Sequence, residues 1–331
     1  MVELRSKCVL LISLISSTLI GQNTIGTVEP LDPQFAQFVA ADAAIEVLAS
    51  GFRWAEGPVW VSELNGVLFS DVPENKVYLW TEEKGLRLFL SPSGMTEHAP
   101  HSTNEGANGL NLDNEGRLLL CQHGDRRIAR LSSPFFESPQ YETVVAYTDG
   151  ARFNSPNDIT VLSNGDLLFT DPPYGLKQQD KDPLKELPYN GIFHWSKNNG
   201  ITLLSKSLTR PNGIAVSKDE KTLYVANSDA QKSYIVAFDW NGKEASNERI
   251  FFDAKQINRP GPGLFDGLRV HSSGTLFATG PGGVLVISSD GRHLGTLRPG
   301  KATANCGFDE NEEYLYLTST NVLARIQILK P

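Results

Sequence analysis

Residues 155–172 read SPNDITVLSNGDLLFTDP: a polar head, an apolar run, a short polar turn and a second apolar run. The same succession recurs about every fifty residues, with further copies that begin at Ala55, Ala107, Arg210, Phe265 and Ala304. A repeat of this length that fills the chain predicts similar units packed on one another in a single closed architecture. We therefore expect the heads of the six copies to lie at equivalent places in the fold.

The apolar runs of each copy have the length and composition of β-strands. In the copy quoted above, Asn164-Gly165 separates two such runs, which is the pattern of a β-hairpin. A third strand is expected at 191–195 and a weaker fourth at 201–204. Four short antiparallel strands in each period are typical of a propeller blade, whereas a β-helix or a β-sandwich does not place four strands in each repeat. The sequence therefore predicts an all-β fold, a six-bladed β-propeller.

The spacing of the heads indicates how the ring of blades closes. Successive heads are 52, 49, 55, 54 and 39 residues apart, so the last blade is short of a strand. Residues 44–48 (AIEVL) could supply its outermost strand from the other end of the chain, which would protect both edges of the ring. We accordingly place the propeller at residues 44–331, after an N-terminal extension at residues 22–43.

The first residues have the composition of a secretory signal. Arg5 and Lys7 precede an uncharged segment of thirteen residues, from Cys8 to Ile20, which is short for a membrane span. We expect residues 1–21 to form a signal peptide and the mature protein to be periplasmic or secreted. A short uncleaved membrane anchor is the alternative.

The charge balance restricts the partners of the protein. The chain has 38 acidic and 30 basic residues, which gives a formal net charge of −8, and no run of Lys and Arg interrupts this balance. Nucleic acids and anionic membranes bind basic surfaces. We therefore expect neither as a partner once the signal is removed, and we expect a monomer or a weak dimer.

The heads carry side chains that suit a hard cation. In a propeller the innermost strands converge on the central channel, so these side chains would meet there. Carboxylates and amides, with no His or Cys, are the donors that Ca²⁺ prefers, and Mg²⁺ or Mn²⁺ after it; Zn²⁺ fits less well. The sequence predicts one divalent metal ion in the channel, surrounded by the heads Glu56, Asn108, Asn157, Asn212 and Asp266. Asn305, the head of a degenerate copy, is expected to contribute less than the others.

A simpler interpretation is that the heads are only turns, since Asn-Gly and Asp-Gly are common turn formers. Two features favour the metal site over this interpretation. Separate pairs such as Asn164-Gly165 already account for the hairpin turns. In addition, Pro156 and Pro211 fix the backbone immediately before Asn157 and Asn212, which suits the rigid aiming of a side chain.

Four dispersed motifs resemble one known family. They are WAEGPVW at 54–60, SPND at 155–158, RPNG at 210–213 and FDG at 265–267, and they are similar to the blade heads of the gluconolactonase/regucalcin-like family. DPPYG at 171–175 and CQHGDRR at 121–127 resemble its bacterial gluconolactonase branch. The resemblance implies metal ligands at Glu56, Asn212 and Asp266, with Asn157 a ligand or a near contact. It also makes Asn108, His123, Arg152 and Tyr174 candidates for binding the substrate.

The function that the resemblance implies is the metal-dependent opening of sugar lactones, gluconolactone first. A water would attack the lactone carbonyl, polarised by the metal, while a carboxylate takes its proton. Asp266 is the leading candidate for this base, and Asp158, which adjoins Asn157, is its rival. Two alternatives stay open: a promiscuous lactonase or phosphotriesterase-type hydrolase on the same metal, and a calcium-binding propeller without catalysis.

Overall fold

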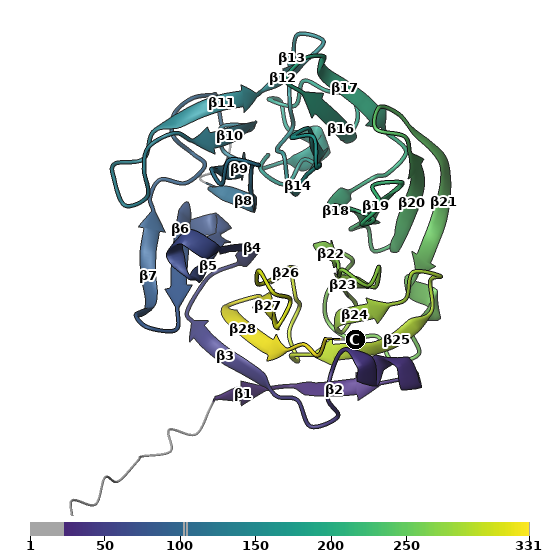
Figure 1. The fold of residues 1–331 in the computed structure, drawn as a ribbon. Helices are drawn as coiled ribbons and strands as arrows, with labels where there is room; N and C mark the ends of the chain where they lie inside the picture. Colours follow the sequence, from purple (N-terminus) through teal and green to yellow (C-terminus); the bar gives the residue numbers. More distant parts are fainter. Residues whose placement is uncertain (1–22, 102, 104, 331) are drawn as a thin grey trace, which may run out of the picture.

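Six antiparallel sheets are arranged as blades around a central channel in the computed structural model of the protein (Figure 1). The structure describes residues 23–101, 103 and 105–330. Each blade has four or five strands, and one further pair, β12 (Tyr147–Thr148) with β13 (Ala151–Arg152), lies between the second and third blades. The predicted six-bladed β-propeller is confirmed.

The first three blades follow the repeat with one strand order, from the channel outward. The first blade contains β4 (Ala55–Val61), β5 (Gly66–Asp71), β6 (Lys76–Thr81) and β7 (Gly85–Leu90). The second contains β8 (Ala107–Leu112), β9 (Leu118–Gln122), β10 (Arg127–Leu131) and β11 (Tyr141–Val145). The third contains β14 (Ile159–Val161), β15 (Leu167–Asp171), β16 (Gly191–Ser196) and β17 (Gly200–Ser205).

The last three blades continue this order. The fourth contains β18 (Pro211–Val216), β19 (Thr222–Asn227), β20 (Tyr234–Trp240) and β21 (Ala245–Asp253). The fifth contains β22 (Leu268–Val270), β23 (Leu276–Gly280), β24 (Gly283–Ile287) and β25 (His293–Arg298), and the sixth contains β26 (Asn305–Phe308), β27 (Tyr314–Ser319) and β28 (Val322–Gln327). Short 3-10 turns occupy Ser62–Leu64, Val72–Glu74, Gln179–Lys181 and Ala254–Gln256.

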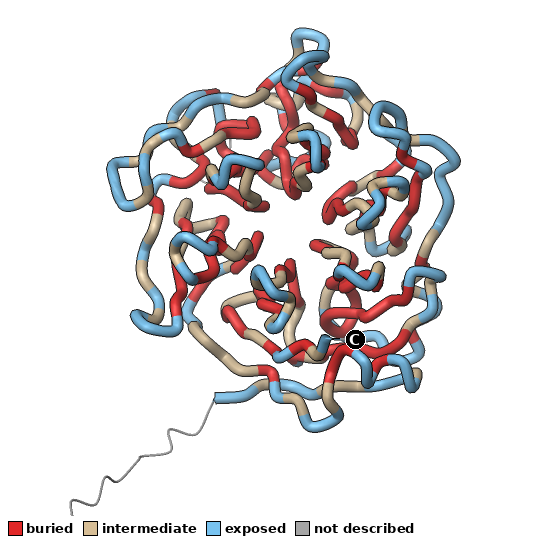
Figure 2. The backbone as a smooth tube through the Cα atoms, in the orientation of Figure 1, coloured by how far each residue is buried: buried red, intermediate tan, exposed pale blue. Residues whose placement is uncertain are grey.

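The second strand of each blade is buried on both faces, because the neighbouring blades cover it. In β15 all five residues, LLFTD, are buried, and Phe169 pairs with Ile159 on one side and Phe193 on the other. Burial on both faces explains the continuous apolar runs in the sequence, where a half-exposed strand would alternate. Figure 2 shows buried backbone within the blades and exposed loops along the outer rim, with exposed turns also near the channel.

The sixth blade closes the ring with a strand from the start of the chain. β3 (Ile45–Ser50) pairs antiparallel with β28, in a register that places Ser50 opposite Val322 and Glu46 opposite Arg325. The prediction that residues near 44–48 supply the outer strand is confirmed. The pairing joins segments from the two ends of the described chain and covers the outer edge of β28.

The residues before β3 pack on the propeller. β1 (Thr24–Ile25) pairs with β3, and β2 (Thr27–Pro30) adds a fifth strand to the fifth blade by pairing with β25. The 3-10 turn Pro33–Gln37 then inserts Phe35, which is 1% exposed, into the core between the fifth and sixth blades. The predicted signal peptide lies outside the described residues. No helix within the described part of the chain is long and apolar enough to cross a membrane.

Neighbouring innermost strands approach closely beside the channel. The N–H groups of Gly109 and Gly213 donate to the carbonyl oxygens of Asn157 and Asp266 in the next blades, at 2.8 and 3.1 Å. A Cβ on Gly213 would lie 2.1 Å from the Asp266 carbonyl oxygen, so a larger residue cannot fit without separating the blades. The glycine that follows the head therefore allows the backbones of two neighbouring blades to approach closely enough for a hydrogen bond. The interpretation of these heads as simple turns is wrong, since Asn108 and Asn212 lie within strands.

We predict that Phe35→Ala strongly destabilises the protein. The buried ring would leave a cavity between two blades, and such a truncation costs about 3–5 kcal/mol in the free energy of unfolding. Phe136→Ala is the matched control, because that ring is 56% exposed. Chemical denaturation of both variants measures the difference. Equal stabilities would show that the N-terminal segment is not part of the folded core.

Candidate active site

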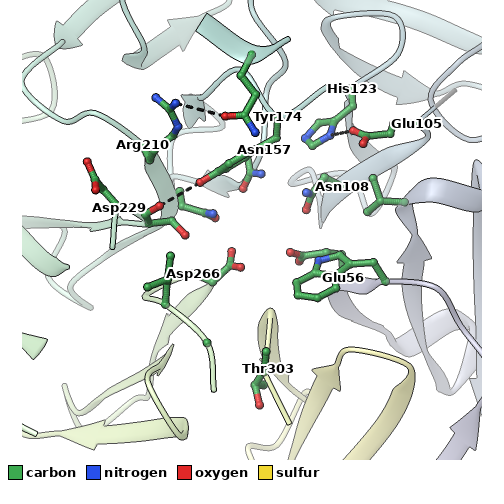
Figure 3. Close-up of a pocket in the computed structure, with 18 of the residues that line it drawn as sticks. Glu56, Glu105, Asn108, His123, Asn157, Tyr174, Arg210, Asp229, Asp266 and Thr303 are labelled. Atoms are coloured by element: carbon green, nitrogen blue, oxygen red, sulfur yellow. Dashed lines mark hydrogen bonds and ion pairs between the residues drawn. The ribbon is translucent and has the colours of Figure 1, made fainter. Parts of the chain in front are cut away.

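A cavity of about 910 Å³ occupies the centre of the ring. Five of the six predicted heads line it, one from each of the first five blades, and Figure 3 shows the Glu56 and Asp266 carboxylates facing one another across it. The repeat thus brings together side chains that are far apart in the sequence: Glu56, Asn108, Asn157, Asn212 and Asp266.

Side chains at the end of the second strands fix the backbone before the heads. Asp171, the last residue of β15, accepts hydrogen bonds from the N–H groups of Asn154 and Ser155, each at 2.8 Å. The segment that leads to Asn157 is thereby held against the end of the neighbouring strand. Two other blades use the same device: Asp71 accepts from the N–H groups of Arg53 and Trp54, and Asn227 accepts from that of Arg210.

The cavity presents oxygen atoms that have no partner. Among the described residues nothing donates to the Oδ1 atoms of Asn108, Asn157, Asn212 and Asp266, although all four atoms are buried. A buried acceptor without a partner costs about 1–3 kcal/mol. Four of them around one space are explained if a cation or a polar ligand occupies that space when the protein functions.

The pKa values of the two cavity carboxylates, Glu56 and Asp266, likewise indicate that their charged forms are poorly stabilised. Burial raises the pKa of Glu56 to about 7, and the nearby charge of Asp158 adds to this effect. Burial, followed by the charges of Glu56 and Asp158, also raises the pKa of Asp266. A divalent cation between the two carboxylates would favour their charged forms and reverse these shifts.

The kind of donor indicates the kind of cation. Within the part of the chain that the structure describes, no three His, Cys, Asp or Glu side chains are grouped to hold a metal. A cation in this cavity would therefore depend on amide oxygens beside the two carboxylates. Such donors fit Ca²⁺, Mg²⁺ or Mn²⁺ better than Zn²⁺.

Two predicted site residues do not line the cavity. Asp158 is fully buried, and its Oδ2 forms an ion pair with Nη1 of Arg269 at 3.2 Å. Arg152 is packed over the Tyr147 ring, with its guanidinium carbon 4.4 Å from the ring centre. Both side chains were expected in the channel because of their place in the sequence, yet their charges are directed to these neighbours. The degenerate head Asn305 is also absent from the cavity lining; its Oδ1 accepts from the N–H of Cys306, and its side chain interacts with the Glu56 carboxylate.

Two further residues predicted to bind the substrate, His123 of the second blade and Tyr174 of the third, line the cavity. Tyr174 donates its hydroxyl hydrogen to the Ser228 carbonyl oxygen at 3.3 Å, and burial raises the pKa of this phenol to about 12. Its proton is therefore not available near neutral pH. His123 is 1% exposed, and one of its ring nitrogens contacts Glu105 (Figure 3).

Other lining residues were not predicted from the sequence. Trp54 and Arg210 lie two residues before the heads Glu56 and Asn212, so their place in the repeat was an available signal. Glu105 and Asp229 come from loops between strands, and nothing in the repeat marks them. These loop residues line the cavity although no period in the sequence marks them.

The fold and the cavity define the class: a six-bladed β-propeller with oxygen-bearing side chains that converge on a central cavity. The comparison with known families identifies the chain more closely. Residues 54–321 match the family described as the SMP-30/Gluconolactonase/LRE-like region. The chain belongs to this family, and the family predicted from the sequence is confirmed.

Individual relatives agree with this assignment. A gluconolactonase of Zymomonas mobilis is 36% identical over 312 residues, which cover 92% of this chain and 87% of that protein. The structure of a gluconolactonase of Xanthomonas campestris superposes with a TM-score of 0.80 at 27% identity, covering 93% of this chain and 97% of that one. A calcium-binding regucalcin of Agrobacterium tumefaciens, at 17% identity and a TM-score of 0.64 over 86% of this chain and 94% of that one, shares the fold.

We predict that Asp171→Asn changes how stability depends on pH. Burial raises the pKa of Asp171 to about 7, so the folded protein holds this proton more tightly than the unfolded chain. Its contribution to the free energy of unfolding is therefore full at about pH 4 and is lost as the pH rises through 7. The difference in stability, wild type minus variant, should fall between pH 5 and pH 8 in denaturation experiments. A constant difference would contradict the assignment.

Proposed function

We propose that the protein hydrolyses sugar lactones, gluconolactone foremost, with one divalent cation, Ca²⁺ first, in the central cavity. The observation that carries this proposal is the convergence of three unpartnered amide oxygens with the Glu56 and Asp266 carboxylates in one cavity. The cavity, at about 910 Å³, has room for a monosaccharide lactone beside the cation. The similarity to gluconolactonases of two bacteria supports the lactone as the substrate class.

The residues that would hold the cation are Glu56, Asn212 and Asp266, with Asn157 beside them. When bound, the cation would act as a Lewis acid that polarises the lactone carbonyl and stabilises negative charge on its oxygen. The chain itself contributes rigidity, because in three blades the end of the second strand fixes the segment before the head. Fixed donors need little reorganisation during the reaction.

The chain also supplies a proton acceptor and contacts for the sugar. The Asp266 carboxylate lines the cavity with an unpartnered oxygen, which supports it as the acceptor of a proton from the attacking water. Asp158 is placed to neutralise Arg269 instead. Asn108 and His123 present polar atoms to the hydroxyl groups of a sugar, and Trp54 and Tyr174 present rings to its apolar face.

The decisive experiment is metal replacement. We expect the chelated protein to lose hydrolysis of aldonolactones and to regain it with Ca²⁺, and less well with Mg²⁺, Mn²⁺ or Zn²⁺. Nitrophenyl esters and phosphotriesters measured in parallel would reveal a promiscuous hydrolase. Calcium binding without turnover of any aldonolactone would reject the proposed activity in favour of a calcium-binding propeller.

We predict that Asp266→Asn impairs both cation binding and turnover. The variant loses a negative charge at the cation and the proton acceptor, so kcat should fall at least about 100-fold and Ca²⁺ affinity should fall as well. Asp219→Asn, at a fully exposed turn, is the control and should behave as the wild type. Calorimetry and lactone hydrolysis measure the two effects. Full turnover by Asp266→Asn would remove Asp266 from the mechanism.

A further inference from the structure

A histidine and a glutamate form a pair at the wall of the cavity, apart from the proposed cation ligands. Nδ1 of His123 lies 3.0 Å from Oε2 of Glu105. Because a carboxylate only accepts hydrogen bonds, Nδ1 carries the hydrogen and donates it to Glu105. The other ring nitrogen, Nε2, is buried and has no partner among the described residues. The pair thus leaves one nitrogen of a nearly fully buried ring free for a ligand.

The backbone holds this pair in place. The N–H of His123 donates to the Gly106 carbonyl oxygen, and the N–H of Gly124 donates to that of Glu105, each at 3.1 Å. Gly175 closes the other side, since a Cβ there would lie 2.8 Å from the Cβ of His123. The ring therefore has little freedom, and its exposed fraction of 1% leaves the cavity as the place where Nε2 can find a partner.

The proposed reaction needs a group of this kind. Opening a lactone breaks the bond between the carbonyl carbon and the ring oxygen, and this oxygen leaves as a strongly basic alkoxide. A proton donor that is active near neutral pH makes this departure easier. Among the described residues that line the cavity, His123 is the only imidazole. Tyr174 is too weak an acid, and Arg210 does not give up its proton.

We propose that His123 is the general acid that protonates the departing ring oxygen, and that Glu105 is the positioning residue that orients it. This inference rests on the proposed lactone hydrolysis. The oxygen of the attacking water bonds to the carbonyl carbon, and one proton of this water passes to Asp266. The ring carbon–oxygen bond then breaks, and the proton on Nε2 of His123 passes to the ring oxygen. A proton returns from Asp266 to His123 through solvent, so the cycle balances.

The role of Glu105 follows from charge and geometry. Its side chain is 29% exposed, and its Oε2 lies 3.0 Å from Nδ1 of the ring. A carboxylate at Nδ1 stabilises the imidazolium and directs the Nε2 proton into the cavity. Without it, the ring could bind a sugar hydroxyl but would be a less well-oriented acid. A residue that only binds the sugar and a residue that gives it a proton therefore predict different kinetic effects.

The first test separates these roles by kinetics with gluconolactone and the calcium-loaded protein. His123→Gln keeps polar atoms but has no transferable proton, so we expect kcat to fall about 100-fold or more with KM changed little. In His123→Ala, added imidazole should restore part of kcat. His101→Gln, an exposed histidine outside the cavity, should match the wild type. A rise in KM with unchanged kcat, or a loss of kcat in His123→Ala that imidazole does not relieve, would overturn the proposal.

The second test needs no activity. In protein labelled with ¹⁵N-histidine, NMR should show a protonated Nδ1 at His123 in the wild type, and more of the Nε2–H tautomer in Glu105→Ala. An unprotonated Nδ1 in the wild type would overturn the assigned orientation. Wild-type protein that opens no lactone with any cation would instead reject the proposed function. The two failures are therefore distinguishable.

Discussion

The close approach of neighbouring innermost strands is the constraint on which the site depends. Glycines after the heads let one blade donate a backbone hydrogen bond to the head carbonyl of the next, as Gly109 does to Asn157 and Gly213 to Asp266. Hydroxyl groups on the second strands reinforce the ring, since Ser70 and Thr170 donate to head carbonyls of adjacent blades at 2.8 and 2.6 Å. These contacts satisfy the backbone of the heads and leave their side chains free for a ligand.

The cost of this arrangement is concentrated in the cavity. Buried amide oxygens without partners and carboxylates with raised pKa values are unfavourable in the protein alone. The rest of the ring compensates through large buried strands, through the β3–β28 closure and through the packing of Phe35. A fold that is stable elsewhere can hold a preorganised polar site, and any ligand that satisfies these groups would stabilise the folded protein by binding to it.

The period of the sequence predicted most of the fold, because each blade repeats one pattern of apolar runs and turns. It also predicted the heads that line the cavity, since equivalent positions in a ring face one axis. It did not predict that the side chains of Asp158 and Arg152 are absent from the cavity lining. Their sequence neighbourhood placed them at the channel, but Asp158 pairs with Arg269, 111 residues away, and Arg152 packs on Tyr147. A charged side chain points toward the group with which it interacts in the folded protein. The repeat in the sequence does not show which group that is.

The sequence by itself determined the number of blades, the closing strand and the converging oxygen donors, because these depend on local pattern and on symmetry. Only the tertiary structure decided which donors are left without partners, and that Glu105 from a loop meets His123 at the cavity wall. Such pairs depend on contacts between segments that have no common period. The physical reason is that strands form from a local pattern of apolar and polar residues. The partner of a buried polar atom, in contrast, depends on how segments distant in the sequence pack against one another.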